Sequence, residues 1–442
     1  MVRDRLHVGV IGAGLGGLAA AIGIARAGHQ VTILEQAAVL GEFKLMTATD
    51  WCRHPDPPNA SRILYHYGLL EKIEAVAVRP KAFMIRSYSD GKILNYLEMY
   101  RYAERRYGYP YLHIHRADYH RILVEEATRL GVDLRLGSSV TSIDFEASSV
   151  QLRGKPSFHA DLLLGCDGLK SVCREALLGR PDPPLLTGDL AYRIVIKVED
   201  MKQHPDLREL VEKPFIHYWL GPNSHVVLYL LQGGDLCNIV LISPDNLPDL
   251  VNTAKADVQE MMDFFQDWDP KLRKVLGLVQ ETTKWRLQNS EEMDSWTHSS
   301  GRFALLGDAC HATLPYLAQG AAQAVEDGAV IGRLFEHIKE RSQIPAVLKI
   351  YEELRKNRTT CVVRGSTSLR DVFHMEDGPR QRERDQQLLE SEPFEGYPNP
   401  WADPVYQAWL FGYDAFREAD EAWGTWKEKG IENREMKIRP NL

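Results

Sequence analysis

A glycine-rich turn between a short apolar strand and an alanine-rich helix is the feature that most constrains this 442-residue chain. The motif G-A-G-L-G-G at residues 12–17 follows an apolar segment at 7–11 and leads into a helical pattern that ends near Gly28. A second apolar segment, residues 30–34, ends on Glu35. A strand, a turn, a helix and a strand in so short a span predict a βαβ unit, and therefore a Rossmann-like α/β fold for this part of the chain.

Each glycine of the turn has a distinct physical role. Gly12 makes the tight turn, Gly14 lets the backbone approach a pyrophosphate, and Gly17 allows the helix to pack closely. The phosphates would lie at a helix N-terminus, where free N–H groups and the helix dipole favour anions. Glu35, at the end of the next strand, can accept hydrogen bonds from ribose hydroxyls. These four residues predict an ADP-containing ligand.

The composition excludes several functional classes. With 44% apolar and 26% charged residues, the chain is an ordinary soluble globular protein. Lys and Arg total 53 against 61 Asp and Glu, a net charge of −8 without a basic block, so we expect no nucleic-acid partner. The uncharged stretch 8–25 is explained by the glycine turn, and we predict no transmembrane segment. Six cysteines without a CxxC pair or a Cys/His cluster predict no metal site and indicate reduced thiols in the cytoplasm.

The middle of the chain has a different texture. Helical spacing at 118–130 is followed by several short apolar pieces that end at residue 164. Further on, the pattern predicts strands at 190–198, 215–220, 225–232 and 237–243, a hairpin turn at 221–223 and an amphipathic helix at 253–265. We interpret residues 181–299 as an antiparallel β-sheet substrate domain. It is inserted into a discontinuous nucleotide-binding domain of residues 1–180 plus 300–345.

The last part of the chain is predicted to be helical. A strand at 302–306 and a long helix at 319–339 return the chain to the first domain. Residues 346–442 indicate a C-terminal helical region. Its charged segment, 370–392, is typical of a solvated face or a flexible loop.

Two further motifs make the chain resemble a known family. G-C-D-G-L-K-S-V-C-R at residues 165–174 and G-D-A-C-H-A-T-L-P at 307–315 occur in the order that single-component FAD-dependent aromatic hydroxylases show. The resemblance is closest to the salicylate hydroxylase-like branch, notably its fungal members. It implies a Rossmann-like FAD-binding domain with an inserted antiparallel sheet. It also implies bound FAD, with NAD(P)H as a transient co-substrate. The sequence contains no second GxGxxG motif, which argues against a separate NAD(P)H-binding domain.

The resemblance assigns several residues to the cofactor. Asp308 follows a buried strand, where its carboxylate can hold ribityl hydroxyls. A helix that begins near Gly320 and Ala321 would aim its N-terminal amides at the flavin and stabilise negative charge on the reduced ring. The other residues assigned to the cofactor region by resemblance are Arg116, Asp167 and Pro315. Asp167 is also expected to support the NAD(P)H site, although an Asp before Gly168 can equally cap a turn.

The substrate wall is expected on the inserted sheet. Alternation along a strand puts His225, Val227 and Tyr229 on one face, an apolar surface with two hydrogen-bonding groups that suits a phenol. Arg193 is the candidate partner of a substrate carboxylate, carbonyl or phenolate. In related enzymes the matching positions face the substrate side of the flavin, so Arg193, His225 and Tyr229 are the predicted catalytic residues. Tyr229 could instead be core packing, and Arg193 could pair with an acidic neighbour.

One segment departs from the family pattern. The family runs through a Gly-Ala-Gly stretch into Pro-Pro-Asn, whereas residues 43–56 lack those glycines before Pro57. The segment is either a remodelled loop or the product of an altered gene model.

These observations favour an FAD-dependent monooxygenase that hydroxylates a phenolic aromatic substrate with NAD(P)H and O₂ through a flavin C4a-hydroperoxide. This is the reaction of a salicylate 1-monooxygenase-like enzyme (EC 1.14.13.-). Two alternatives remain open. One is a secondary-metabolism monooxygenase that carries out dearomatising hydroxylation or epoxidation of a polyketide. The other is a flavin-binding protein that is inactive because of the altered 43–56 segment.

Overall fold

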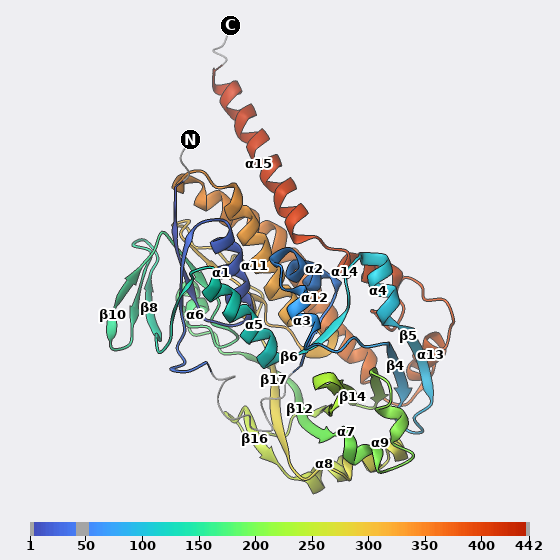
Figure 1. Ribbon diagram of the computed structural model, residues 1–442. Helices are drawn as coiled ribbons and strands as arrows, with labels where there is room; N and C mark the ends of the chain where they lie inside the picture. Colours follow the sequence, from blue (N-terminus) through green and yellow to red (C-terminus); the bar gives the residue numbers. More distant parts are fainter. Residues whose placement is uncertain (1–3, 41–52, 439–442) are drawn as a thin grey trace.

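Five parallel strands form the sheet that carries the glycine-rich turn (Figure 1). The structure is a computed structural model that describes residues 4–40 and 53–438. The strand order is β18-β11-β1-β2-β7, with β1 (His7–Ile11), β2 (Gln30–Leu34), β7 (Asp133–Arg135), β11 (Leu162–Gly165) and β18 (Phe303–Leu305). Every neighbouring pair is parallel, so the carboxyl ends of these strands meet at one edge. The predicted βαβ unit is confirmed.

Helices cover this sheet and join it to the rest of the molecule. Helix α1 (Leu15–Arg26) follows the glycine turn and packs against α11 (Gly320–His337) and α5 (Arg116–Arg129). The remaining helices of the first 310 residues are α2 (Pro58–Tyr67), α3 (Leu70–Glu74), α4 (Met99–Tyr107), α6 (Val172–Leu178), α7 (Val198–Lys202), α8 (Val258–Phe264), α9 (Pro270–Leu276) and α10 (Asp308–His311). Buried aliphatic side chains from β1, α1, β11, β18 and α11 form one continuous core.

An eight-stranded sheet forms the second layer, in the order β16-β17-β12-β15-β14-β13-β4-β5. Its strands are β4 (Ala82–Ser87), β5 (Ile93–Glu98), β12 (Leu185–Lys197), β13 (Phe215–Gly221), β14 (Ser224–Leu231), β15 (Leu236–Pro244), β16 (Thr253–Ala256) and β17 (Thr282–Asn289). All pairs are antiparallel except β13 with β4. The predicted antiparallel sheet is confirmed, and so is the hairpin turn between β13 and β14.

The two faces of the eight-stranded sheet have different partners. One face packs Val226 and Leu228 against α8 and α9 in a core of its own. The opposite face turns Val227, Tyr229 and Val240 toward a second cluster that includes residues 314–318. Because residues 314–318 directly precede α11, this second face lies against the layer that carries the predicted cofactor residues.

The C-terminal region is helical, as predicted, and consists of α12 (Ile344–Phe373), α13 (Pro379–Leu388), α14 (Pro404–Phe411) and α15 (Ala415–Ile438). Helix α15 begins against α11 and then extends away from the body of the protein (Figure 1). Two small sheets complete the fold, one with β8 (Val140–Asp144), β9 (Ser149–Leu152) and β10 (Lys155–His159), the other with β3 (Arg53–Asp56) and β6 (Leu112–His115).

Three features differ from the sequence predictions. Residues 253–256 of the predicted helix form β16 instead, because they pair with β17, and α8 begins only after Asp257 caps it. The charged segment 370–392 is not a loop throughout, since it contains α13. Strands β4 and β5 come from residues 82–98, inside the predicted first domain, yet they extend the second sheet through the β4–β13 pair.

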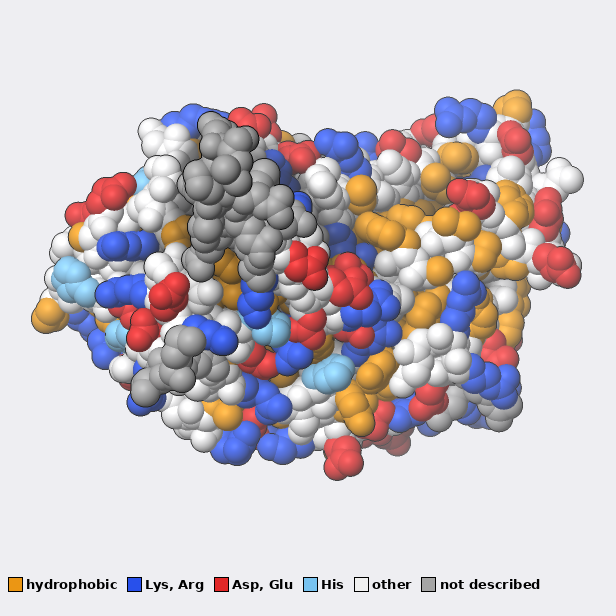
Figure 2. Space-filling model, turned by 90° about the horizontal axis from the view of Figure 1, so that it is seen from above, with side chains coloured by type: hydrophobic (Ala, Val, Ile, Leu, Met, Phe, Trp, Pro, Cys, Tyr) orange, Lys and Arg blue, Asp and Glu red, His pale blue; other side chains and the backbone are white. Residues whose placement is uncertain are grey.

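Acidic and basic side chains are interspersed over the face shown in Figure 2, and hydrophobic side chains gather toward one end. Within residues 4–40 and 53–438, no helix is both long and apolar enough to cross a membrane. In the same part of the chain, no group of three or more His, Cys, Asp or Glu side chains is placed to hold a metal ion.

Candidate cofactor and substrate site

The three sequence motifs meet at one edge of the parallel sheet. Backbone hydrogen bonds extend the strand pairing past the strand ends, from Gly12 N to Leu34 O (2.9 Å), from Cys166 N to Ile11 O (2.8 Å) and from Leu306 N to Gly165 O (2.9 Å). The glycine turn, the 165–174 motif and the 307–315 motif are therefore neighbours in space, although they are far apart in sequence.

The glycine turn leaves room for a ligand at one position only. Gly12 has a φ of 106°, and a Cβ there would overlap the backbone of Cys166, whereas a Cβ at Gly17 would overlap the carbonyl oxygen of Gly12. At Gly14, by contrast, no atom of the described residues lies within 4 Å of where a Cβ would be. Gly14 is also the N-cap of α1 and provides no side chain to cap it. The open space thus lies beside unpaired helix N–H groups, which is the arrangement that a pyrophosphate needs.

Glu35 is held against this turn. Its Oε2 accepts a hydrogen bond from Ala13 N (2.9 Å), and its Oε1 accepts one from Ala37 N (2.8 Å). Each carboxylate oxygen has a further lone pair, so Glu35 can still accept from ribose hydroxyls. His120 of α5 contacts the same turn through its Nε2, 2.7 Å from Ala13 O. Arg116 is the first residue of α5 and lies one helical turn before His120, and its contact with the cofactor stays a prediction.

Asp308 and Asp167 have different surroundings. Asp308 is exposed at the start of α10, and among the described residues its carboxylate forms no hydrogen bond or ion pair. Asp167 is committed to its own loop, because it accepts hydrogen bonds from Ser171 Oγ (2.5 Å) and Cys173 N (3.1 Å) at the start of α6. The turn-capping role of Asp167 is therefore present, and its role toward cofactor and NAD(P)H stays a prediction.

Pro315, Gly320 and Ala321 lie together on the approach to α11. Pro315 is exposed and begins a 3₁₀ turn, η4 (Pro315–Leu317). The chain then passes through Ala318, whose φ of 55° is left-handed, and enters α11 at Gly320. Gly320 and Ala321 are partly exposed, so the first amides of α11 are not covered by the core.

The substrate face of the eight-stranded sheet carries the predicted polar residues. Val227 of β14 pairs with Val240 of β15, which in turn pairs with Arg193 of β12, so the three share a face. The guanidinium of Arg193 lies over the ring of Trp285, 4.5 Å from its centroid. The rings of Tyr229 and His113 meet edge to face, with 5.1 Å between their centroids. His113 belongs to β6, the strand that leads to Arg116.

Comparison with known proteins identifies the family. The model of the FAD binding domain family matches residues 5–366. The protein belongs to this family. It is 40% identical over 427 residues to the FAD-dependent monooxygenase OpS4 of Beauveria bassiana (strain ARSEF 2860), covering 95% of this chain and 98% of that protein. It is 30% identical over 413 residues to a 3-hydroxybenzoate 6-hydroxylase of Polaromonas naphthalenivorans (strain CJ2), with 92% and 96% covered.

The fold agrees with this assignment. A salicylate hydroxylase substrate complex superposes with a TM-score of 0.78 at 24% identity, covering 95% of this chain and 98% of that one. The protein is therefore an FAD-dependent monooxygenase of the aromatic hydroxylase type. The space in front of Gly14, the carboxylate of Glu35 and the uncommitted carboxylate of Asp308 fit FAD. We expect the first two to hold its ADP part and Asp308 to hold the ribityl chain.

Arg193 lies opposite Val240 and Val227, midway along the strand direction between His225 and Tyr229, which are four residues, or about 13 Å, apart on the same face of β14. His225 differs from Arg193 and Tyr229 in its surroundings. It is buried among aromatic rings, and its Nδ1 lies 2.8 Å from Nε2 of His374. Burial, reinforced by His374, holds the pKa of His225 well below its usual value, so its imidazole is neutral near pH 7.

Asn238 is a site residue that the sequence reasoning missed. It lies on β15 directly opposite Tyr229, on the face that also carries Val240. Its side chain is only 2% exposed, and among residues 4–40 and 53–438 its Nδ2 has no hydrogen-bond partner. The available signal was a single amide in the otherwise apolar run at 237–242. A buried, unsatisfied donor is costly, so its presence here points to a ligand acceptor.

The altered segment 43–56 falls mostly outside the described residues. Of this segment the structure describes residues 53–56, which form β3 and pair with β6.

Asp308→Ala is expected to weaken FAD binding by about 10- to 100-fold, the loss of one hydrogen-bonded charged group. The protein should remain folded, because Asp308 is exposed and supports no other described residue. Titration of the apoprotein with FAD, followed by flavin fluorescence, measures the change. Asp249→Ala, an equal charge change on the exposed loop between β15 and β16, is the matched control. An unchanged affinity in Asp308→Ala would remove this residue from the cofactor site.

Proposed function

We propose that this monooxygenase hydroxylates a phenolic aromatic substrate that carries an anionic or carbonyl group, using NAD(P)H and O₂. The observation that carries the proposal is the row of polar side chains on the apolar substrate face, Arg193, Asn238 and Tyr229. A relative that is a 3-hydroxybenzoate 6-hydroxylase supports the same substrate class. We also propose a cytoplasmic location and the domain division given above, except that residues 82–98 belong with the substrate sheet.

Each of the three polar side chains has a distinct task in this proposal. Arg193, supported by the ring of Trp285, binds the substrate anion. Asn238 donates its Nδ2–H to a second oxygen of the substrate, which satisfies the buried donor. Tyr229 borders the ring and can hydrogen-bond its hydroxyl. The apolar residues Val227 and Val240 exclude water from the reacting ring.

His225 is proposed to act at a distance from the ring. As a neutral imidazole paired with His374, it fixes the start of β14 against the C-terminal end of α12. Bound FAD supplies the redox chemistry that activates O₂. The protein's own contribution is to orient the substrate, stabilise its anionic form and keep water out.

The experiment is to purify the protein with its flavin and to follow NADH and NADPH oxidation with salicylate, 3-hydroxybenzoate and simple phenols. We expect at least one hydroxybenzoate to accelerate oxidation and to yield a hydroxylated product in chromatography. Product analysis also separates aromatic hydroxylation from dearomatisation or epoxidation. Oxidation without stimulation and without product, across the whole set and with both nicotinamides, would contradict the proposal.

Asn238→Leu is expected to have opposite effects on stability and on substrate use. Leucine fits the volume and removes an unsatisfied buried donor, so the free energy of unfolding should rise by about 1 kcal/mol without substrate. The kcat/KM for the best hydroxybenzoate should fall about tenfold, because one substrate hydrogen bond is lost. Thermal unfolding and steady-state kinetics measure the two effects. An unchanged kcat/KM would show that Asn238 does not face the substrate.

A further inference from the structure

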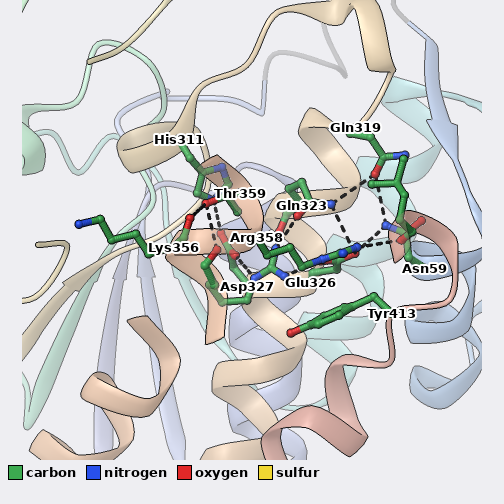
Figure 3. Close-up of polar contacts among 12 residues, drawn as sticks. Asn59, His311, Gln319, Gln323, Glu326, Asp327, Lys356, Arg358, Thr359 and Tyr413 are labelled. Atoms are coloured by element: carbon green, nitrogen blue, oxygen red, sulfur yellow. Dashed lines mark hydrogen bonds and ion pairs between the residues drawn. The ribbon is translucent and has the colours of Figure 1, made fainter. Parts of the chain in front are cut away.

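A cluster of four buried charges lies behind the cofactor edge, between α11 and α12 (Figure 3). Glu326 and Asp327 are adjacent on α11 and fully buried. Arg355 and Arg358 approach them from α12, with Arg355 Nε 2.6 Å from Asp327 Oδ1 and Arg358 Nε 2.8 Å from Glu326 Oε2. Two carboxylates thus face two guanidinium groups inside the protein.

The two carboxylates and Arg355 are held in their charged forms. Burial alone would raise the pKa of Glu326, but the charges of Arg358 and Arg355 hold it below its usual value. Burial opposes ionisation of Asp327 in the same way, and His311 and Arg355 lower its pKa. The pKa of Arg355 is raised by Glu326 and Asp327 against the effect of burial. The charges of the carboxylates and guanidiniums therefore balance.

Asp327 connects the cluster to the turn that carries Asp308. Its Oδ2 accepts a hydrogen bond from Gly307 N (2.9 Å) and lies 2.5 Å from Nε2 of His311. Gly307 and His311 bracket Asp308 from both sides. The position of the Asp308 backbone is thus fixed by a carboxylate that does not itself reach the cofactor edge.

Glu326 connects the cluster to the start of α11. Its Oε1 accepts a hydrogen bond from Asn59 Nδ2 (2.6 Å), and the same Nδ2 lies 3.3 Å from Oε1 of Gln319, the N-cap of α11. Figure 3 shows Asn59, Gln319 and Glu326 joined in this way. Asn59 also follows the 43–56 segment. Neighbouring carboxylates therefore hold two separate turns of the cofactor site.

We propose that Glu326 and Asp327 are positioning residues for FAD, which hold the Asp308 turn and the α11 N-terminus in one fixed relation. A buried ion cluster is poor evidence for stability as such, because apolar residues of similar size often serve at least as well. Apolar residues could not form the hydrogen bonds that Asp327 makes with Gly307 and His311, or the one that Glu326 makes with Asn59. Cofactor-facing amides act on charge only when their positions are fixed beforehand.

The test measures flavin binding and flavin properties in the holoenzyme. Asp327→Asn and Glu326→Gln keep the shape of the side chains but remove the charge. We expect Asp327→Asn to raise the Kd for FAD about tenfold or more, measured as flavin fluorescence released on dilution. Glu326→Gln is expected to shift the midpoint potential and the visible absorption of the bound flavin, since it loosens the α11 N-terminus. Wild-type Kd, potential and spectrum in both variants would overturn the proposal.

Asp420→Asn is the matched control. Asp420 of α15 pairs with Arg333 (2.7 Å) and His337 (2.6 Å) of the same helix α11, at a partly exposed position away from both turns. It removes an ion pair from α11, and we expect wild-type flavin affinity and potential. If Asp420→Asn weakens FAD as much as Asp327→Asn does, general loosening of α11 explains the effect and the proposal is wrong.

Two milder variants decide the case if the charge variants fail to fold. His311→Leu and Asn59→Leu leave all four charges in place, and each removes one hydrogen bond between the cluster and its surroundings. The proposal requires that His311→Leu raises the Kd for FAD and that Asn59→Leu shifts the flavin potential, with the melting temperature of the apoprotein unchanged. Wild-type flavin behaviour in these folded variants, or flavin loss that only accompanies a lowered apoprotein melting temperature, would contradict it.

Discussion

Gly14→Val is expected to give a folded protein that no longer retains FAD. The backbone at Gly14 is extended, with φ −70° and ψ 176°, a conformation that valine adopts readily. In the part of the chain that the structure describes, no atom lies within 4 Å of the new Cβ, so we expect the fold itself to be undisturbed. The valine methyl groups would instead occupy the space in front of the α1 N-terminus. We expect a loss of at least about 100-fold in FAD affinity, or about 2.8 kcal/mol.

The ratio of absorbance at the flavin and protein bands after purification measures FAD retention, and thermal unfolding of the apoprotein measures the fold. Gly17→Val provides the contrast, because its Cβ would overlap the carbonyl oxygen of Gly12 and should lower the melting temperature. Stoichiometric flavin in purified Gly14→Val would show that the phosphates bind elsewhere.

Arg193→Met is expected to uncouple NAD(P)H oxidation from hydroxylation. Methionine keeps much of the apolar length over Trp285 but removes the charge and the donors. If Arg193 holds the substrate anion, its loss should cost about 2 to 5 kcal/mol of transition-state stabilisation. FAD should remain bound, and reduced flavin should release H₂O₂ because the ring to be attacked is no longer held in place.

The measurement is the ratio of hydroxylated product to NAD(P)H consumed, with kcat/KM for the best hydroxybenzoate. Arg193→Lys, which keeps the charge but not the planar fork of donors, should lie between wild type and Arg193→Met. An unchanged ratio and an unchanged kcat/KM in Arg193→Met would make Arg193 a structural residue of β12.

The meeting of the three motifs at one edge of the parallel sheet could be predicted because the sequence signals are local. Glycine spacing at residues 12–17, a strand ending on Glu35 and a buried strand before Asp308 each depend on a few consecutive residues. The rule that parallel strands end at one edge then brings these pieces together without further information. Strand alternation similarly predicted that Val227 and Tyr229 share a face, which the core contacts confirm.

The parts that were missed depend on partners far away in the chain. His225 is drawn into an aromatic cluster by His374, 149 positions later, and no local pattern announces that contact. Residues 253–256 have helical spacing, but pairing with β17 outweighs it. The four-charge cluster joins residues that look like ordinary surface charges of α11 and α12 until the two helices are packed. The role proposed for Asn238 depends on the three-dimensional structure, in which no described neighbour accepts a hydrogen bond from its Nδ2.

The parallel pairing of β4 with β13 has a consequence for biosynthesis. Ala82 lies opposite Phe215, so the eight-stranded sheet cannot be completed until a long stretch of later sequence has left the ribosome. Pairings of such separation form slowly, because loop-closure entropy is lost before the contacts are gained. A fragment cut at residues 181–299 would leave β13 as a bare edge strand, ready to pair with other chains. We therefore expect that fragment to aggregate. In the complete chain, the β4–β5 hairpin keeps one edge of β4 free until β13 pairs with it.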